Sequence, residues 1–173
     1  MYSNKTKYLK YFLLGDIATG KSSFLTAIRE NMILDQDQDQ PISSLLLFYQ
    51  FTYESVKVFL NVIEIPGKTK KRTLFYHGSR GCDACIFFYD VTNPDSLKNI
   101  NHAILLATDI CLNAQFFVVG NKIDLIDKRL IAFEEAKKYF DELGLQFWEI
   151  SCKDNVMIKE TIEIIAFNLL NKV

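Results

Sequence analysis

Apolar residues follow two patterns along this chain: short runs, and longer segments in which they recur every three or four positions. The first pattern predicts β-strands and the second predicts amphipathic α-helices. The predicted strands are residues 8–14, 45–52, 56–64, 84–89, 115–119 and 146–150, and the predicted helices are residues 21–31, 95–111, 133–143 and 156–170. Because strands and helices alternate, the pattern indicates an α/β fold.

Three segments refine this prediction. Residues 84–89 form a continuous apolar run, which is typical of a central strand covered on both faces. Only three residues separate the second and third predicted strands, so these two should pair as an antiparallel hairpin. In the helix at 95–111, Ile100, Ile104 and Leu105 form the predicted apolar stripe.

Size and charge exclude several classes of protein. The chain has 173 residues, which favours a single domain, residues 1–173, that buries its own core. It carries 20 basic and 21 acidic side chains and a formal net charge of −1, so we expect no nucleic-acid partner. Since no apolar run approaches the roughly 18 residues of a membrane-spanning helix, we also expect no intrinsic membrane segment.

The four cysteines are Cys82, Cys85, Cys111 and Cys152. The Cys-x-x-Cys spacing of the first two suggests zinc, but no second pair of cysteines or histidines in the sequence completes a four-ligand set. The pair also stands at the entry to the buried strand. We therefore predict reduced core thiols in a cytoplasmic protein.

Residues 15–22, Gly-Asp-Ile-Ala-Thr-Gly-Lys-Ser, fit the pattern Gly-x4-Gly-Lys-Ser/Thr, the phosphate-binding loop of nucleoside triphosphatases. The glycines permit backbone conformations in which successive N–H groups point at one anion. Lys21 brings a charge to the β- and γ-phosphates, and Ser22 offers a hydroxyl to Mg2+. The predicted phosphate-binding residues of this loop are Asp16, Ile17, Ala18, Thr19, Gly20, Lys21, Ser22 and Ser23.

Three further stretches carry a family resemblance. Residues 121–124, Asn-Lys-Ile-Asp, follow a predicted strand and resemble the guanine-reading Asn-Lys-x-Asp of small GTPases. Residues 149–153, Glu-Ile-Ser-Cys-Lys, resemble their second guanine loop. Residues 80–92, Arg-Gly-Cys-Asp-Ala-Cys-Ile-Phe-Phe-Tyr-Asp-Val-Thr, with Ser96 and Leu97 after them, are similar to the Rab branch. Over nearly its whole length, the chain resembles a divergent Rab-like member of the Ras superfamily of small GTPases.

This resemblance implies the P-loop NTPase fold, a six-stranded, mostly parallel sheet with one antiparallel strand and helices on both faces. It implies binding of GTP and GDP with Mg2+, and switch regions that contact protein effectors and regulators. A role as a molecular switch in vesicle trafficking or signalling follows from the resemblance alone. No C-terminal prenylation tail is visible before Val173, so we expect peripheral membrane attachment only if a lipidated tail or a partner recruits the protein.

The chemistry of guanine recognition supports the same assignment. The carboxylate of Asp124 can accept hydrogen bonds from both N1–H and the exocyclic amine of guanine, whereas adenine would leave it unpaired at a cost of several kcal/mol, on the order of a lost charged hydrogen bond. Asn121 would brace the loop, and the stem of Lys122 would lie on one face of the base. The predicted guanine-binding residues are Asn121, Lys122, Asp124, Leu125, Ser151, Cys152 and Lys153.

The third strand ends in Glu-Ile-Pro-Gly-Lys, residues 64–68, where relatives carry Asp-Thr-Ala-Gly-Gln. Gly67 keeps an N–H that can approach a γ-phosphate. Glu64 replaces the aspartate that steadies Mg2+ and is one methylene longer, so we expect weaker Mg2+ binding through it. Lys68 replaces the glutamine that orients the attacking water. An ammonium has no acceptor for that water, so no catalytic residue is intact and hydrolysis should be slow.

Two other positions depart from the family. Ile17 stands where relatives have Gly or Ser, and its side chain either crowds the γ-phosphate and an arginine finger or turns outward. No threonine lies where the first switch should bind Mg2+, so Ser43 or Ser44 is the nearest hydroxyl for the metal.

The sequence leaves one alternative open. Lys68, Ile17 and the missing threonine favour a pseudo-GTPase, an interaction module that binds nucleotide without cycling or does not bind it. An ATP-using enzyme is disfavoured, because it would leave Asp124 without a role.

Overall fold

The computed structural model describes residues 5–33, 46–53, 55–65 and 80–171. The strands are β1 (Lys5–Gly15), β2 (Leu46–Tyr53), β3 (Val56–Glu64), β4 (Ala84–Asp90), β5 (Gln115–Asn121) and β6 (Gln146–Glu149). The helices of the described residues are α1 (Lys21–Ile33), α3 (Pro94–Ile110), α4 (Phe133–Glu142) and α5 (Ile158–Leu170), with a short 3-10 turn η1 (Ile126–Lys128).

The strands form one sheet in the order β2-β3-β1-β4-β5-β6. Strand β2 runs antiparallel to β3, as the predicted hairpin requires, and every other neighbouring pair is parallel. Five strands therefore share one direction and β2 alone opposes them. The prediction of a six-stranded, mostly parallel sheet in an α/β fold is confirmed.

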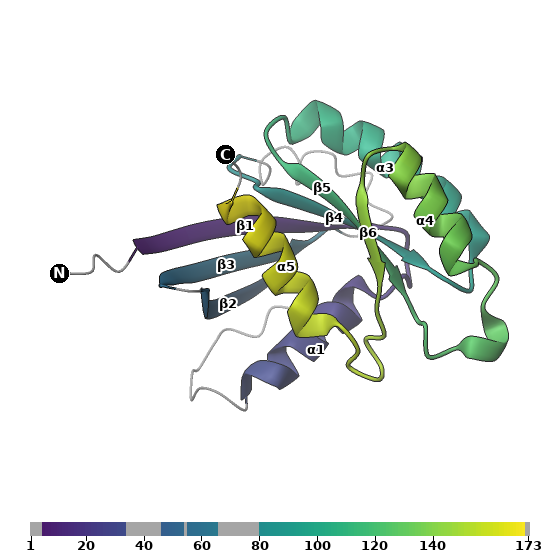
Figure 1. The fold of residues 1–173 in the computed structure, drawn as a ribbon, viewed down its shortest axis with the longest axis horizontal. Coiled ribbons are helices and arrows are strands. Elements are labelled where there is room, and N and C mark those ends of the chain that lie inside the picture. Colours follow the sequence, from purple (N-terminus) through teal and green to yellow (C-terminus); the bar gives the residue numbers. More distant parts are fainter. Residues whose placement is uncertain (1–4, 34–45, 54, 66–79, 172–173) are drawn as a thin grey trace.

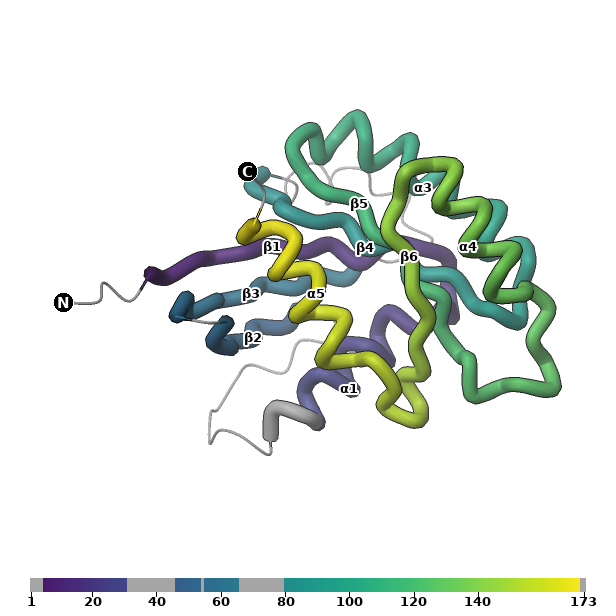
Figure 2. The backbone as a smooth tube through the Cα atoms, viewed as in Figure 1, coloured from purple at the N-terminus to yellow at the C-terminus, as the bar shows by residue number. Residues whose placement is uncertain are grey.

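Helices cover both faces of this sheet (Figures 1 and 2), with α1 and α5 on one side and α3 and α4 on the other. Each side has its own hydrophobic core, one built on Phe24 of α1 and Ile162 of α5, the other on Ile100 of α3 and Phe140 of α4. Every residue of β4 is buried, as expected of a strand covered on both faces. The carboxyl ends of the parallel strands thus meet at one edge, where loops can form a site.

The element boundaries lie within three residues of the predicted ones, and three details differ from the prediction. Strand β1 begins at Lys5 because its backbone pairs with β3 from that residue on, although its first four side chains are exposed. The last helix begins at Ile158 because Val156 instead pairs with Ser151 through two backbone hydrogen bonds. Leu105 is 67 % exposed and so is not part of the stripe that α3 buries.

None of the helices in the described ranges is both long and apolar enough to cross a bilayer.

Candidate nucleotide-binding site

The predicted phosphate-binding loop joins the end of β1 to the start of α1. Two glycines take left-handed conformations there, Gly15 with φ 135° and Gly20 with φ 100°. A Cβ atom on Gly15 would lie 2.3 Å from the carbonyl oxygen of Phe88, and one on Gly20 would lie 1.9 Å from Nδ2 of Asn121. Both glycines are therefore required by the close packing of this loop on β4 and β5.

Lys21 folds back over its own loop. Its Nζ donates hydrogen bonds to the carbonyl oxygens of Gly15, at 2.9 Å, and Asp16, at 2.6 Å, and the residue is buried. Burial lowers the pKa of Lys21, while the nearby carboxylates of Glu64 and Asp16 oppose that shift. Because a buried ammonium needs an anionic partner, a phosphate in this loop would stabilise the charged form of Lys21.

Ser22, at the start of α1, and Glu64, at the end of β3, lie side by side. The hydroxyl of Ser22 donates a hydrogen bond of 2.7 Å to Oε2 of Glu64, whose side chain is buried. Two oxygens bound to adjacent positions of one Mg2+, each at about 2.1 Å, would lie about 3.0 Å apart. The two oxygens are thus close to the spacing that Mg2+ requires, and they are the kind of ligand that it prefers.

Asp16 and Ile17 of the loop differ in their surroundings, because Asp16 contacts a neighbouring helix and Ile17 faces solvent. Asp16 accepts a hydrogen bond of 2.7 Å from Nδ2 of Asn99 in α3, which ties the loop to the neighbouring helix. Ile17 is 53 % exposed, so its side chain lies at the surface of the loop and does not fill it. That position leaves the side chain accessible to a residue arriving from a partner.

Asn121 connects the two predicted halves of the site. At the end of β5, its Nδ2 donates to the carbonyl oxygen of Thr19 at 3.0 Å. Its Oδ1 accepts from the backbone N–H groups of Lys122, at 2.7 Å, and Cys152, at 3.2 Å. One buried side chain therefore fixes the phosphate loop, its own loop and the loop after β6 relative to one another.

Asp124, in the loop after β5, lies beside Ser151, in the loop after β6. The hydroxyl of Ser151 donates to Oδ1 of Asp124 at 2.7 Å, and the aspartate side chain is only 7 % exposed. Oδ2 lies 3.9 Å from Nζ of Lys153, which is longer than a hydrogen bond. Oδ2 therefore keeps acceptor capacity for a ligand that brings its own N–H groups.

Lys122 forms an ion pair with Asp90, the last residue of β4. Nζ of Lys122 lies 2.6 Å from Oδ2 of Asp90, and Oδ1 of Asp90 accepts from the N–H and hydroxyl of Thr92. Burial raises the pKa of Asp90, but the hydrogen bonds from Lys122 and Thr92 outweigh it and the pKa is lowered. The ion pair fixes the ammonium end of Lys122 and so directs the stem of this side chain.

A second ion pair supports the loop after β6. The guanidinium of Arg129 donates to both carboxylate oxygens of Glu149, at 2.9 and 2.7 Å, and to the carbonyl oxygen of Ile131. The hydroxyl of Tyr89 contacts the same carboxylate at 3.4 Å. Arg129 and Asn99 belong to no motif of the sequence, and the Rab-like stretch that contains Asp90 does not mark it as a residue that supports a loop.

Four of the predicted site residues lie outside the described residues. These positions are Ser43, Ser44, Gly67 and Lys68. The metal ligands of the first switch and the water-orienting position therefore stay predictions.

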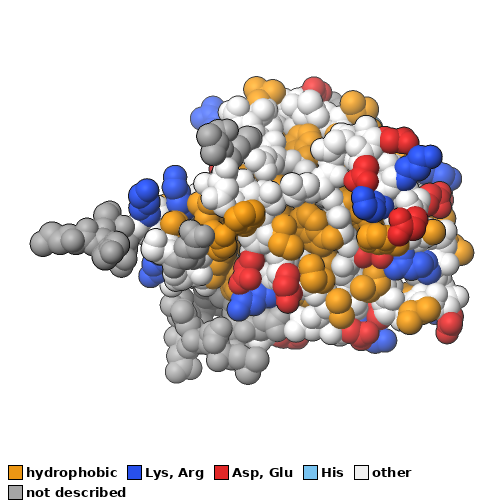
Figure 3. Space-filling model, in the orientation of Figure 1, with side chains coloured by type: hydrophobic (Ala, Val, Ile, Leu, Met, Phe, Trp, Pro, Cys, Tyr) orange, Lys and Arg blue, Asp and Glu red, His pale blue; other side chains and the backbone are white. Residues whose placement is uncertain are grey.

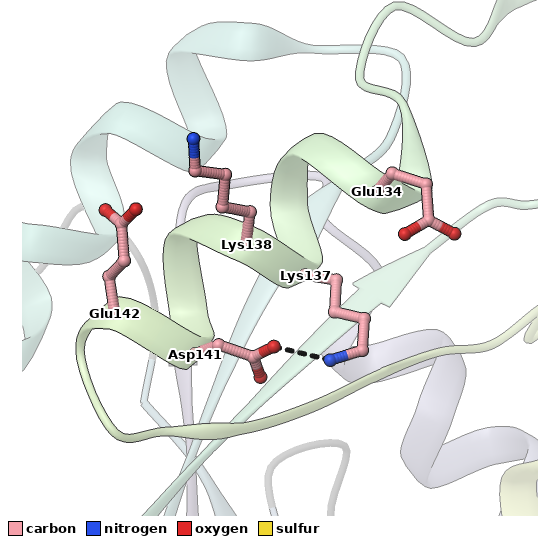
Figure 4. Close-up of a pocket in the computed structure, with 5 residues that line it drawn as sticks. All are labelled: Glu134, Lys137, Lys138, Asp141 and Glu142. Carbon is pink, nitrogen blue, oxygen red and sulfur yellow. Dashed lines mark hydrogen bonds and ion pairs between the residues drawn. The ribbon is translucent and has the colours of Figure 1, made fainter.

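A shallow hollow on α4 is a different kind of surface. It is lined by Glu134, Lys137, Lys138, Asp141 and Glu142, all from one helix (Figure 4). Lys137 and Asp141 pair with each other there. Acidic and basic side chains lie side by side over this part of the molecule (Figure 3), and the residues that line the hollow are all charged, whereas ligand sites are lined mostly by hydrophobic and aromatic side chains. We interpret it as a solvated helix face.

Comparisons with known proteins agree with the geometry. The sequence model of the family described as Ras family matches residues 10–171. The chain is 29 % identical to the Ras-related protein Rab-3A of Homo sapiens and to Rab-3D of Mus musculus, with 89 % of this chain and 70 % of each relative covered. It is also 29 % identical to the Ras-related protein RabZ of Dictyostelium discoideum, with 86 % of this chain and 65 % of that relative covered. The chain belongs to the Ras family, and its relatives identify it as a divergent, Rab-like small GTPase.

Proposed function

We propose that this protein binds GTP and GDP with Mg2+ and acts as a molecular switch that hydrolyses GTP slowly. The observation that carries the proposal is the position of Asp124, whose Oδ1 is held by Ser151 while Oδ2 keeps acceptor capacity. A base with N–H groups at two adjacent positions fits that carboxylate, and guanine is such a base. Family membership supports the same ligand.

The phosphates would lie in the loop between β1 and α1. Lys21 would turn its ammonium from the loop carbonyls toward the β- and γ-phosphates, and the backbone N–H groups would point at them. Asn121 would hold this loop at a fixed distance from the base, because it bonds both sides. The stem of Lys122, directed by Asp90, would lie along the ring.

Ser22 and Glu64 would hold the metal ion. Their oxygens lie 2.7 Å apart and so fit a hard, oxygen-binding cation. Bound Mg2+ supplies positive charge to the phosphates during their hydrolysis. Glu64 is longer than the aspartate of relatives, so its carboxylate would bind the ion directly or take the place of a bridging water, and Mg2+ would bind more weakly.

Slow turnover is the second part of the proposal. Lys68 cannot accept a hydrogen bond from the attacking water, so hydrolysis would stay near the unassisted rate, about 10^3 to 10^5 below that of a stimulated enzyme. The switch regions would contact protein effectors and regulators, as in a trafficking or signalling switch in the cytoplasm. The relatives named Rab-3A, Rab-3D and RabZ support this branch of the family.

The nucleotide that copurifies with the protein tests the proposal. Protein purified in Mg2+ buffer and denatured should release GTP or GDP, identified by ion-exchange chromatography against standards. The equilibrium affinity for fluorescent GDP should then exceed that for fluorescent ADP by at least about 10^4-fold. A site with a carboxylate that accepts from the N–H groups of guanine rejects adenine, because adenine lacks these donors. Release of adenine nucleotide, or equal binding of both, would overturn the guanine assignment.

A pseudo-GTPase is the second candidate, and two departures of the sequence from the family favour it. Lys68 offers no acceptor to the attacking water, and no threonine stands where the first switch should bind Mg2+. Such a protein would bind nucleotide equally with and without Mg2+ and would show no GTP loss over a prolonged single turnover. Mg2+-dependent affinity together with measurable phosphate release would exclude it.

A further inference from the structure

Three cysteines meet on the far side of the molecule from the nucleotide site. Cys82 precedes β4, Cys85 lies in β4, and Cys111 caps the C-terminal end of α3. Their sulfur atoms all lie within 4.8 Å of one another, with 3.9 Å between Cys82 and Cys85, and all three residues are buried. The sequence pattern supplied only the Cys-x-x-Cys pair, and the packing of α3 on β4 brings the third thiol.

Regular structure fixes the backbones of Cys85 and Cys111. Cys85 pairs in register with Phe12 of β1 and Phe116 of β5, in the middle of the sheet. The N–H of Cys111 donates to Ala107 at 2.7 Å, and its carbonyl accepts from Ala114 at 3.0 Å. Cys85 and Cys111 thus come from a strand and a helix cap, and the thiol of Cys82 donates to the carbonyl oxygen of Ala84 at 3.2 Å.

The sulfur spacing matches coordination to one ion. A thiolate binds Zn2+ at about 2.3 Å, so two thiolates on one ion, at angles between tetrahedral and trigonal, lie about 3.8 to 4.0 Å apart. The 3.9 Å between Cys82 and Cys85 falls in that range, and the third sulfur needs to move by less than an ångström. We propose that Cys82, Cys85 and Cys111 form a three-thiolate site for a soft d10 cation, Zn2+ or Cu+.

Softness and charge set the choice of ion. Thiolates select Zn2+ and Cu+ over hard cations such as Mg2+, so this site would not compete for the metal of the nucleotide site. Binding forms three sulfur–metal bonds and releases the thiol protons to solvent. Three ligands suit Cu+, whereas Zn2+ takes a fourth ligand. The complex of three thiolates with Zn2+ has a net charge of −1 and the complex with Cu+ a net charge of −2, so burial favours Zn2+.

The site would act as a clamp between two elements. The cysteines lie at the start of β4 and the end of α3, whereas Asp90 and Asn99, which support the nucleotide loops, lie at the end of β4 and in the first half of α3. These elements run side by side (Figure 1). An ion at the cysteines would therefore join them without contacting the nucleotide, and it would raise the melting temperature whether or not nucleotide is bound.

Metal titration of the full chain tests the proposal. Reduced, metal-free protein is titrated with Zn2+ against a chromophoric chelator, and separately, without oxygen, with Cu+ against a Cu+ chelator. We expect one ion to bind per chain in at least one of the two titrations and to raise the melting temperature. The titration that shows saturable binding identifies the ion. Cys111→Ser should weaken binding about 100-fold or more, because one of three ligands is lost.

Cys152→Ser is the matched control, because it removes the one thiol outside the cluster and should leave metal affinity unchanged. Should Cys111→Ser fail to fold, Cd2+ bound to the wild-type chain gives a second measurement, since its charge-transfer absorbance counts the bound thiolates. We expect three. Absence of saturable binding in both arms, equal affinity of Cys111→Ser and wild type, or fewer than three thiolates on Cd2+ would overturn the site.

Discussion

The hydroxyl of Ser22 donates a hydrogen bond of 2.7 Å to the buried carboxylate of Glu64. Ser22 is the proposed metal-binding hydroxyl, so the carboxylate of Glu64 reaches the proposed metal site. The two residues are brought together by the parallel pairing of β1 with β3, in which Leu13 lies opposite Glu64. The same contact therefore bears on both metal affinity and the rate of cycling.

Glu64→Asp should increase the affinity for Mg2+ in the GDP complex by about tenfold, since the shorter carboxylate restores room for a bridging water. The measurement is the dissociation rate of fluorescent GDP as a function of Mg2+ concentration. Glu64→Gln is the control, because it keeps the length and removes the charge, and it should weaken the Mg2+ dependence. If both variants show the wild-type dependence, Glu64 is not near the ion.

Asp124→Asn should exchange guanine for xanthine specificity. Guanine donates at both N1 and C2, whereas xanthine donates at N1 and accepts at C2, and an asparagine can match that second pattern. We expect GDP affinity to fall and XDP affinity to rise, each by about 10^2-fold or more, in competition against a fluorescent nucleotide. Asp127→Asn, an exposed carboxylate of η1, is the control and should bind GDP as the wild type does. Unchanged GDP affinity in Asp124→Asn would remove this carboxylate from the base site.

The sheet could be predicted from the sequence because its strands are set by local patterns. Residues 84–89 form an apolar run that only a doubly covered strand accommodates, and β4 is buried along its whole length. Where local pattern and pairing disagree, pairing decides. Lys5 is exposed and polar, yet it belongs to β1 because Val56 of β3 pairs with it.

The supporting contacts of the site could not be predicted, because they join residues far apart in the chain. Arg129 reaches Glu149 and Asn99 reaches Asp16 only after the helices have packed. Cys111 lies in no motif with another cysteine. It comes close to Cys82 and Cys85 only because the C-terminal end of α3, which Cys111 caps, packs beside them. The spacing of residues in a sequence motif identifies those that act together on one loop. The side chains that support the loop from elsewhere in the chain become apparent only from the tertiary packing.

Lys68→Gln should raise the single-turnover rate of GTP hydrolysis roughly tenfold or more, because glutamine both donates to and accepts from the attacking water. Phosphate release from preloaded protein is the readout. Lys68→Ala removes the ammonium without adding an acceptor, so it should stay as slow as the wild type. An equal rate in Lys68→Gln and Lys68→Ala would place the defect in Ile17 or in the first switch instead.

Asp90→Asn should destabilise the fold in a pH-dependent way. The hydrogen bonds from Lys122 and Thr92 hold the pKa of Asp90 below its usual value although burial raises it. A carboxyl whose folded-state pKa is lowered stabilises the protein above its unfolded pKa, about 3.9, and loses that contribution as the pH falls through the folded pKa. Replacing it should thus cost about 1 to 3 kcal/mol at neutral pH, in the range of hydrogen bonds to a charged group, and little at the acid end.

Urea unfolding between pH 7 and pH 3 measures this difference. Asp109→Asn removes an exposed carboxylate of α3 and is the control, because it should leave the difference in free energy of unfolding small at every pH. Since Asp90 also fixes Lys122, the affinity of Asp90→Asn for GDP should fall at neutral pH as well. A destabilisation of the same size at pH 7 and pH 3 would show that the loss arises from packing and that the ion pair contributes nothing to stability.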